Sequence, residues 1–188
     1  MRLFVGVELC QEARREAERT AAALRERLGH AVTARWVSAE NLHVTVRFIG
    51  HVADDRVPAV IAHTTAPLPT STFTLRLEGC GVFPQSGAPR VVWIGLAEGL
   101  TELTHLHEEL NRRLAPLGFD PEERAFSAHL TLARIKHLKA RPQQLRQTVS
   151  AVAPAPSVCT VSHATLFRSH LSPHGSRYEP LARIPFAR

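Results

Sequence analysis

Two short segments of the chain place a histidine two residues before a threonine, in nearly the same surroundings. The segments are NLHVTVRF at 41–48 and SAHLTLAR at 127–134. Side chains alternate between the faces of a β-strand, so His43 and Thr45 would share one face, as would His129 and Thr131. Two such strands side by side would put two imidazoles and two hydroxyls around one cavity. That set suits acid and base chemistry on a phosphate.

The spacing alone is a weak signal, because the chain has eleven histidines and four of them precede a threonine by two residues. The other two copies start at His63 and His163. We expect His63 to lie where a helix runs into a loop, since no aliphatic alternation surrounds it. His163 shares its strand face with large apolar residues, which favours a structural role. Only the flanking residues distinguish the segments of His43 and His129 from these two copies.

Composition places the chain among ordinary globular proteins. The 188 residues are 44% hydrophobic and 21% charged, enough for one substantial core or two small lobes. We expect no membrane span and no signal peptide, since the first residues read as a strand. The three cysteines lack the spacing of a disulfide framework or a zinc site. These features predict a cytoplasmic protein. We expect a monomer, because no apolar stripe in the sequence indicates an interface.

The net charge of +6 favours an anionic partner. Nucleic acid is the natural candidate, although the basic residues are scattered along the chain. Charge alone leaves RNA, DNA and phosphorylated metabolites undecided.

The periodicity of apolar residues predicts how the two histidine strands are positioned. Gln11–Leu28 is expected to form an amphipathic helix that Gly29 ends, and Leu100–Leu117 a second long helix. A histidine strand follows each helix, the first ending at Gly50 and the second covering Phe126–Ile135. This repeated order predicts two related lobes around a shared cleft. Helices and strands do not alternate one for one, so the expected class is α+β with antiparallel or mixed sheets and outer helices.

The remaining segments are expected to be shorter. They are strands near 2–8, 73–77, 90–96, 158–167 and 177–181, a helix from about 54 to 66, another within 141–153, and loops at 81–89 and 169–176.

Taken together, these segments resemble the 2H phosphoesterases, and among them the RNA 2',3'-cyclic phosphodiesterases, long called 2'-5' RNA ligases. The resemblance covers nearly the whole chain and is carried by residues 2–7, 36–37, 41–50, 90–93, 126–134 and 169–178. Three positions depart from the family pattern. Ala128 and Cys10 stand where proline is usual, and Val46 stands where leucine is usual.

The resemblance implies a single bilobal domain over residues 1–188 that needs no metal or cofactor. It would open a 2',3'-cyclic phosphate at an RNA end to a 2'-phosphomonoester, and some family members run the reverse 2'-5' ligation. The RNA end could be a tRNA fragment, another RNA or a small cyclic nucleotide. His129 would act as the base toward water and His43 as the acid toward the ribose 3' oxygen.

Three further residues are expected at the phosphate. Thr45 and Thr131 would donate hydrogen bonds to its non-bridging oxygens. The family pattern also places Arg134 there. Strict alternation along the strand would point this arginine away from the cavity unless the strand bends or bulges. The aromatic side chains of Trp36 and Phe48 are expected in the core.

Two other interpretations compete with this one. Eleven histidines invite a zinc site, but no HExxH motif, cysteine pair or nearby set of carboxylates accompanies the two segments. The second alternative is a non-catalytic RNA- or nucleotide-binding module on the same scaffold. Paired acid and base groups argue against it, since binding alone would call for basic and aromatic side chains.

Overall fold

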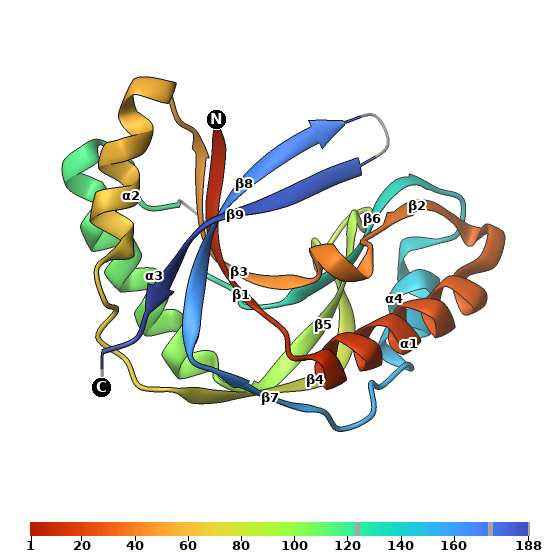
Figure 1. The fold of residues 1–188 in the computed structure, drawn as a ribbon. Coiled ribbons are helices and arrows are strands. Elements are labelled where there is room, and N and C mark those ends of the chain that lie inside the picture. The colour runs from red at the N-terminus through yellow and green to blue at the C-terminus, as the bar shows by residue number, and fades with distance from the viewer. Residues whose placement is uncertain (123–124, 173–174, 188) are drawn as a thin grey trace.

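An antiparallel sheet of nine strands carries the two histidine segments (Figure 1). The structure is a computed structural model and describes residues 1–122, 125–172 and 175–187. The strands are β1 (Arg2–Glu8), β2 (Val32–Trp36), β3 (His43–His51), β4 (Phe73–Phe83), β5 (Val91–Glu98), β6 (Leu130–Leu138), β7 (Val158–Val161), β8 (His163–Ser172) and β9 (Gly175–Pro185). The α-helices are α1 (Gln11–Leu28), α2 (Val57–Thr65), α3 (Leu100–Leu114) and α4 (Pro142–Ser150).

The two long helices confirm the predicted periodicity. Helix α1 spans the expected residues and ends at Gly29, which has a positive φ of 42° that favours glycine. Helix α3 buries leucines at helical spacing, together with His107; they are Leu103, Leu106, Leu110 and Leu114. A short 3-10 turn, Ala115–Leu117, follows it. Among the described residues, no helix is long and apolar enough to cross a membrane.

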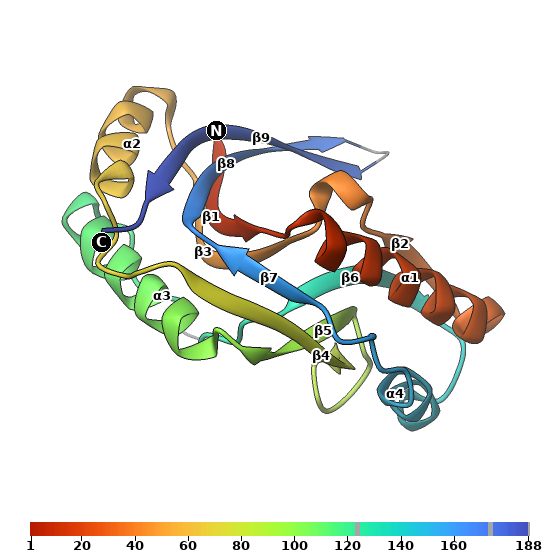
Figure 2. The ribbon, with the colours of Figure 1, turned by 60° about the horizontal axis from the view of Figure 1, so that its bottom comes forward.

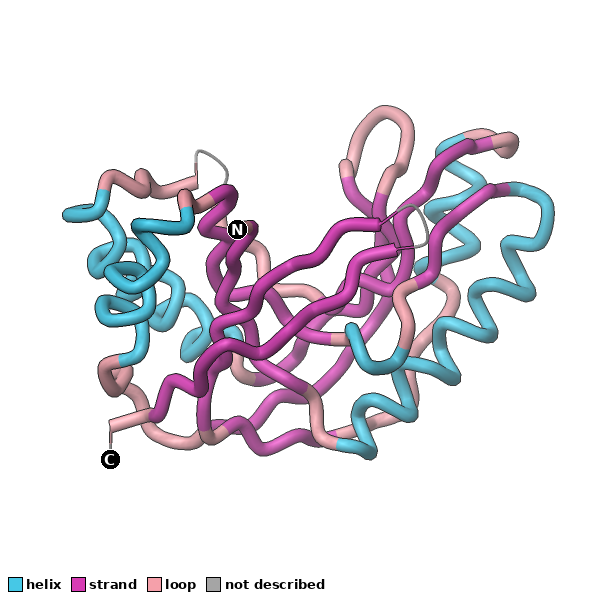
Figure 3. The backbone as a smooth tube through the Cα atoms, turned by 45° about the horizontal axis from the view of Figure 1, so that its top comes forward, coloured by secondary structure: helices cyan, strands magenta, loops and turns pink. Residues whose placement is uncertain are grey.

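Strand order divides the sheet into two halves that meet at the histidine strands. The order is β7-β4-β5-β6-β3-β1-β8-β9, with β2 pairing on β6. Helices α2 and α3 lie at one end of the molecule and α1 and α4 at the other, with the strands between them (Figure 3). The α+β class and the antiparallel sheets around the histidine strands are therefore confirmed, and the two halves share one continuous sheet.

The predictions near the C-terminus were partly wrong. The segment expected as one strand at 158–167 is two strands, because β7 pairs with β4 and β8 pairs with β1 at the other side of the sheet. The expected loop at 169–176 is largely a β-hairpin, in which β8 reaches Ser172 and β9 begins at Gly175. Residues 173 and 174 of that loop lie outside the described residues. In Figure 1 the two strands of the hairpin run from the middle of the molecule toward the upper right.

Candidate active site

The two histidine strands are direct neighbours. Strands β3 and β6 pair antiparallel with Val44 opposite Leu130. In an antiparallel pair the two chains run in opposite directions from such a pair, so His43 lies across from Thr131, and Thr45 across from His129. His43 is the first residue of β3, whereas β6 begins one residue after His129, later than predicted. The sheet thus brings both His-x-Thr segments to one place.

Each histidine strand contains a β-bulge at the same position. In β3, Arg47 pairs with Val5 and Thr45 pairs with Gly6, which leaves Val46 as an extra residue. In β6, Ala133 and Thr131 pair with consecutive residues of β5, which leaves Leu132 as the extra residue in the same way. A bulge reverses which face the following side chains occupy.

The bulge in β6 explains the position of Arg134. The side chain of Leu132 and that of Ala133 are both fully buried, and Arg134 is exposed on the face that holds the histidine. Its positive charge lowers the pKa of both histidines, which places it near them. Strict alternation would have placed Arg134 on the opposite face from His129, and the bulge at Leu132 places it on the same face.

The matching residue after the other bulge is Phe48, which was wrongly expected in the core. Its side chain is 37% exposed, and the guanidinium of Arg2 lies 4.9 Å from the centre of its ring. Arg47 is instead buried, where it donates to the carbonyls of Phe48 and Asp120. Trp36 packs partly buried against the core, close to expectation.

Both imidazoles are anchored in the same way. Nδ1 of His43 lies 2.7 Å from the carbonyl oxygen of Asn41, and Nδ1 of His129 lies 2.7 Å from that of Ser127. A carbonyl oxygen only accepts, so each Nδ1 carries the proton and donates it. In the neutral rings Nε2 is therefore an acceptor. Nε2 of His43 lies 3.0 Å from Oγ1 of Thr45, within hydrogen-bond distance.

The ring of His43 sits in an aromatic surround. Its centre lies 4.8 Å from that of Phe4 and 5.0 Å from that of Tyr178, which meets it edge-on at 86°. Gly6 lies beneath it, where a Cβ would come 3.2 Å from Cδ2 of His43 and 3.0 Å from the carbonyl oxygen of Val44. The absence of a side chain at position 6 lets the imidazole lie close to β1.

His129 has one aromatic neighbour of this kind and an open cavity beside it. The ring of Phe83 meets it edge-on, with centres 5.0 Å apart. A cavity of about 470 Å³ lies next to the segment that leads into β6. Its lining includes Trp93, Gly95, Phe126, Ser127 and Ala128.

Burial dominates the electrostatics of the two histidines. It lowers the pKa of His43 to about 4, and positive charge on His129 and Arg134 adds to the lowering. The carboxylate of Glu8, which pairs with His43 across β1 and β3, acts in the opposite direction. Burial likewise lowers the pKa of His129, with Arg134 as a smaller cause. Both rings are therefore neutral at pH 7 when no anion is bound.

Asn41 joins the first histidine segment to the β8–β9 hairpin. Its Nδ2 donates to the carbonyl of Ser176 at 2.8 Å and to Oγ of Ser38 at 2.9 Å, while its Oδ1 accepts from the backbone N–H of Tyr178 at 3.3 Å. The same residue supplies the carbonyl that anchors His43. Sequence reasoning identified neither this role nor that of Glu8, because both depend on contacts between distant strands.

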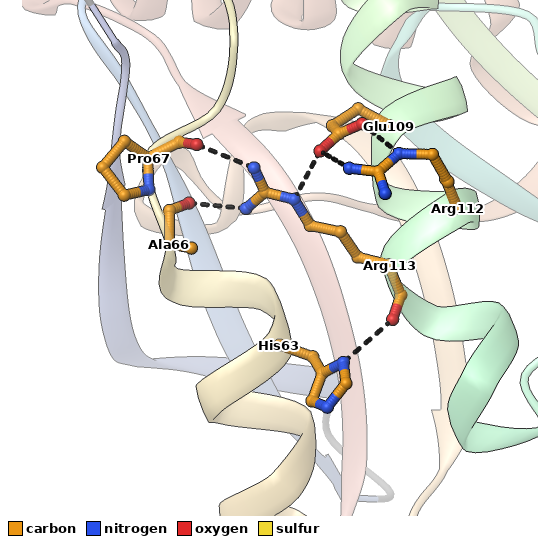
Figure 4. A network of polar contacts seen from close by, with 6 residues as sticks. All are labelled: His63, Ala66, Pro67, Glu109, Arg112 and Arg113. Carbon is orange, nitrogen blue, oxygen red and sulfur yellow. Dashed lines mark hydrogen bonds and ion pairs between the residues drawn. The ribbon is translucent and has the colours of Figure 1, made fainter.

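The two other His-x-Thr copies are not part of the β3–β6 pair, although His163 lies beside Glu8, the residue that pairs with His43. His63 is in α2, and its Nδ1 lies 3.3 Å from the carbonyl oxygen of Arg113 in α3 (Figure 4). The guanidinium of that arginine donates to the carbonyls of Ala66 and Pro67. His163 begins β8, with Nε2 at 4.0 Å from the carboxylate of Glu8.

In the part of the chain that the structure describes, no three His, Cys, Asp or Glu side chains form a group that could hold a metal ion.

Known proteins resemble this chain over most of its length. Residues 10–173 match the 2'-5' RNA ligase superfamily. An RNA 2',3'-cyclic phosphodiesterase of Aeropyrum pernix is 35% identical over 167 residues, which cover 88% of this chain and 94% of the relative. One of Archaeoglobus fulgidus is 38% identical over 72% of this chain and 73% of the relative.

Solved structures agree with the sequence relatives. The crystal structure of TT0787 of Thermus thermophilus has a TM-score of 0.79 and 26% identity, covering 99% of this chain and 98% of that one. That of E. coli LigT complexed with 3'-AMP has a TM-score of 0.74 and 27% identity, covering 100% and 98%. The chain belongs to the 2'-5' RNA ligase superfamily and, within it, to the family of the RNA 2',3'-cyclic phosphodiesterases.

Proposed function

We propose that this protein is a phosphodiesterase that hydrolyses a terminal 2',3'-cyclic phosphate of RNA to a 2'-phosphomonoester, with its two histidines as acid and base. The observation that carries the proposal is the matched anchoring of His43 and His129. Each ring donates from Nδ1 to a backbone carbonyl, so each keeps Nε2 for exchanging a proton with substrate. The activity itself follows the names of the relatives.

The reaction is an in-line displacement at phosphorus. Neutral His129 takes a proton from water as the water oxygen bonds to phosphorus. The bond between phosphorus and the ribose 3' oxygen breaks on the opposite side, and protonated His43 gives its proton to that oxygen. Attack and departure lie on opposite sides, which is why two separate groups are needed. The mechanism uses no metal ion.

Negative charge on the phosphate builds up in the transition state. We assign its stabilisation to the hydroxyls of Thr45 and Thr131 and the guanidinium of Arg134. The threonines lie across from the opposing histidines in the β3–β6 register. The arginine lies on the same face because of the bulge at Leu132.

His43 must be protonated to act as the acid, but its pKa in the empty site is low. At about 4 in the empty site, the group is rarely charged at pH 7. A bound phosphate brings a negative charge beside the ring, which favours the protonated form. Glu8 contributes in the same direction. We therefore infer that substrate binding itself charges the acid.

The substrate is an RNA end, tRNA fragments among the candidates, attracted by the net charge of +6. The reverse 2'-5' ligation would use the same groups with their roles exchanged. We expect a cytoplasmic monomer made of one bilobal domain.

The test is hydrolysis of a short RNA that ends in a 2',3'-cyclic phosphate, with and without EDTA, and with identification of the monophosphate formed. We expect a 2'-phosphate, at the same rate with the chelator. His43→Ala and His129→Ala should each lower the rate by roughly 10²–10⁴-fold. His63→Ala, in another His-x-Thr copy, is the matched control and should keep the parent rate.

Two results would contradict the proposal. Loss of activity in EDTA would indicate a metal-dependent nuclease. Binding of the RNA end without any turnover by the parent protein would favour a binding module on the same scaffold.

A further inference from the structure

Two of the three cysteines, far apart in the sequence, lie against each other. Cys10 immediately precedes α1, and Cys159 is in β7. The backbone N–H of Cys10 donates to Sγ of Cys159 at 2.8 Å, and Sγ of Cys10 lies 3.6 Å from the carbonyl oxygen of Val158. Figure 2 shows the start of α1 beside β7. Both thiols therefore occupy the same small space between these elements.

The two thiols differ in accessibility. Cys159 is buried, with 2% of its surface exposed, whereas Cys10 is partly exposed. Burial raises the pKa of Cys159 to about 11, and its hydrogen bond with the Cys10 side chain also raises it. The 2.8 Å between the Cys10 backbone nitrogen and Sγ of Cys159 likewise places the two thiols side by side. An oxidant from solution would thus meet Cys10 first and find Cys159 next to it.

The third cysteine provides an internal comparison. Cys80 is buried in β4, and burial raises its pKa to about 11. It shares the burial of Cys159, but burial is the cause of its raised pKa and no other thiol contributes to it. Any reaction that depends on the pair should leave it unchanged.

We propose that Cys10 and Cys159 form a reversible disulfide by exchange with a low-molecular-weight disulfide such as oxidised glutathione. The thiolate of Cys10 attacks one sulfur of glutathione disulfide, forms a mixed disulfide and releases one reduced glutathione. Cys159, which is a thiol at neutral pH, then gives up its proton and attacks Sγ of Cys10, and the second glutathione leaves as a thiolate that takes up a proton. Two protein thiols are oxidised and one glutathione disulfide is reduced to two thiols, so atoms and electrons balance.

The bond would fasten the start of α1 to β7 across 149 positions of sequence. A cross-link that closes so long a loop restricts the unfolded chain and stabilises the folded one. Cys10 follows Glu8, the carboxylate next to His43, by two residues. The bond would therefore fix the connection between β1, which ends at Glu8 in the active site, and α1.

The full-length protein tests this inference directly. It is incubated with oxidised glutathione under native conditions, the remaining thiols are alkylated, and peptides are mapped by mass spectrometry. We expect a peptide that links Cys10 to Cys159, an alkylated Cys80, and a Tm increase of roughly 5–15 °C. A reductant should reverse both changes. Cys80→Ser should behave as the parent protein does.

Single variants separate this disulfide from unspecific oxidation. In Cys159→Ser the mixed disulfide should accumulate on Cys10, and Tm should not rise. Cys10→Ser should give neither product. A stable glutathione adduct on Cys10 of the parent protein, a link through Cys80, a disulfide between two chains, or no reaction at Cys10 would each overturn the inference.

Discussion

Val46 and Leu132 occupy matching positions in the two β-bulges, and the carbonyl of each accepts a hydrogen bond from outside the paired ladder. His107 of α3 donates from Nδ1 to Val46 at 2.7 Å. The backbone N–H of Val37, just beyond β2, donates to Leu132 at 2.8 Å. A bulge disrupts its ladder locally, and buried backbone groups need partners. The donor to the bulge carbonyl is an imidazole in β3 and a backbone N–H in β6.

The first prediction concerns the bulge in β3. Replacing His107 by leucine removes the donor to Val46 and leaves a buried carbonyl without a partner. We expect His107→Leu to lower the free energy of unfolding by roughly 1–3 kcal/mol, measured by urea denaturation. His105→Leu is the matched control, because His105 is exposed on the same helix. Equal stability of the two variants would show that the bulge does not depend on this hydrogen bond.

The second prediction concerns the bulge in β6, which places Arg134 on the histidine face. We expect Arg134→Ala to lower kcat/KM by roughly 10²–10³-fold, since one donor to the developing phosphate charge is lost. The variant should also shift the pH optimum upward, because the charge of Arg134 lowers the pKa of both histidines.

Lys136→Ala is the control for this charge. Lys136 is exposed two residues further along β6, and its removal changes the net charge equally. An unchanged pH optimum in Arg134→Ala, or the same loss of rate in both variants, would remove Arg134 from the site.

The pH dependence of kcat/KM follows from the directions of the two pKa shifts. The active form has one histidine charged and one neutral, so the profile is a bell centred between the two pKa values. Both values lie below the ordinary value of about 6.5, and the optimum for the free enzyme is therefore expected below pH 6.5. The optimum of kcat should lie higher, because bound phosphate raises the pKa of His43. A kcat/KM optimum above pH 7 would contradict this interpretation.

Local pattern predicted the long elements and the paired histidines, and it failed where long-range pairing decides the outcome. The leucines of α3 and the alternation around His43 are visible in any short window of sequence. The bulge at Leu132 is not, because nothing in SAHLTLAR marks the residue that the neighbouring strand will skip. The end of the β8–β9 hairpin, within 169–176, was expected as a loop for a similar reason. Its serine-, proline- and glycine-rich stretch has turn composition, and cross-strand pairing overrides it on both sides of the turn.

The fourth prediction treats Asn41 as a positioning residue. Asn41→Ala keeps the carbonyl that anchors His43 but releases the β8–β9 hairpin from the turn before β3. We expect kcat to fall roughly 10–100-fold, as for other residues that orient a reacting group, with a smaller change in KM. Ser38→Ala is the control, since it removes the hydrogen bonds of the Ser38 hydroxyl with Asn41 and Glu40 and leaves the contacts of Asn41 with the hairpin in place. A Tm loss without a change in kcat would indicate a purely structural role.

The last prediction links the buried acid to stability. The pKa of His43 is about 4 in the folded protein and about 6.5 in the unfolded chain. Between these values the unfolded chain binds more protons, so stability rises with pH through this window and falls as pH decreases from 6.5 toward 4. The shift corresponds to roughly 3 kcal/mol once pH is below both values, at 1.36 kcal/mol per unit.

His43→Gln removes the titrating group, and its free energy of unfolding should therefore depend less on pH. Urea denaturation of both proteins at pH 7.5 and pH 4.5 measures the difference. Between pH 7.5 and pH 4.5 the free energy of unfolding of His43→Gln should fall less than that of the parent protein, by most of the roughly 3 kcal/mol. His63→Gln, at an exposed position in α2, should lose as much as the parent protein does. Parallel pH dependence in His43→Gln and the parent would mean that His43 is not desolvated in the folded protein. In that case the acid would not need the substrate phosphate to charge it, and the optimum for kcat/KM would lie closer to neutral pH.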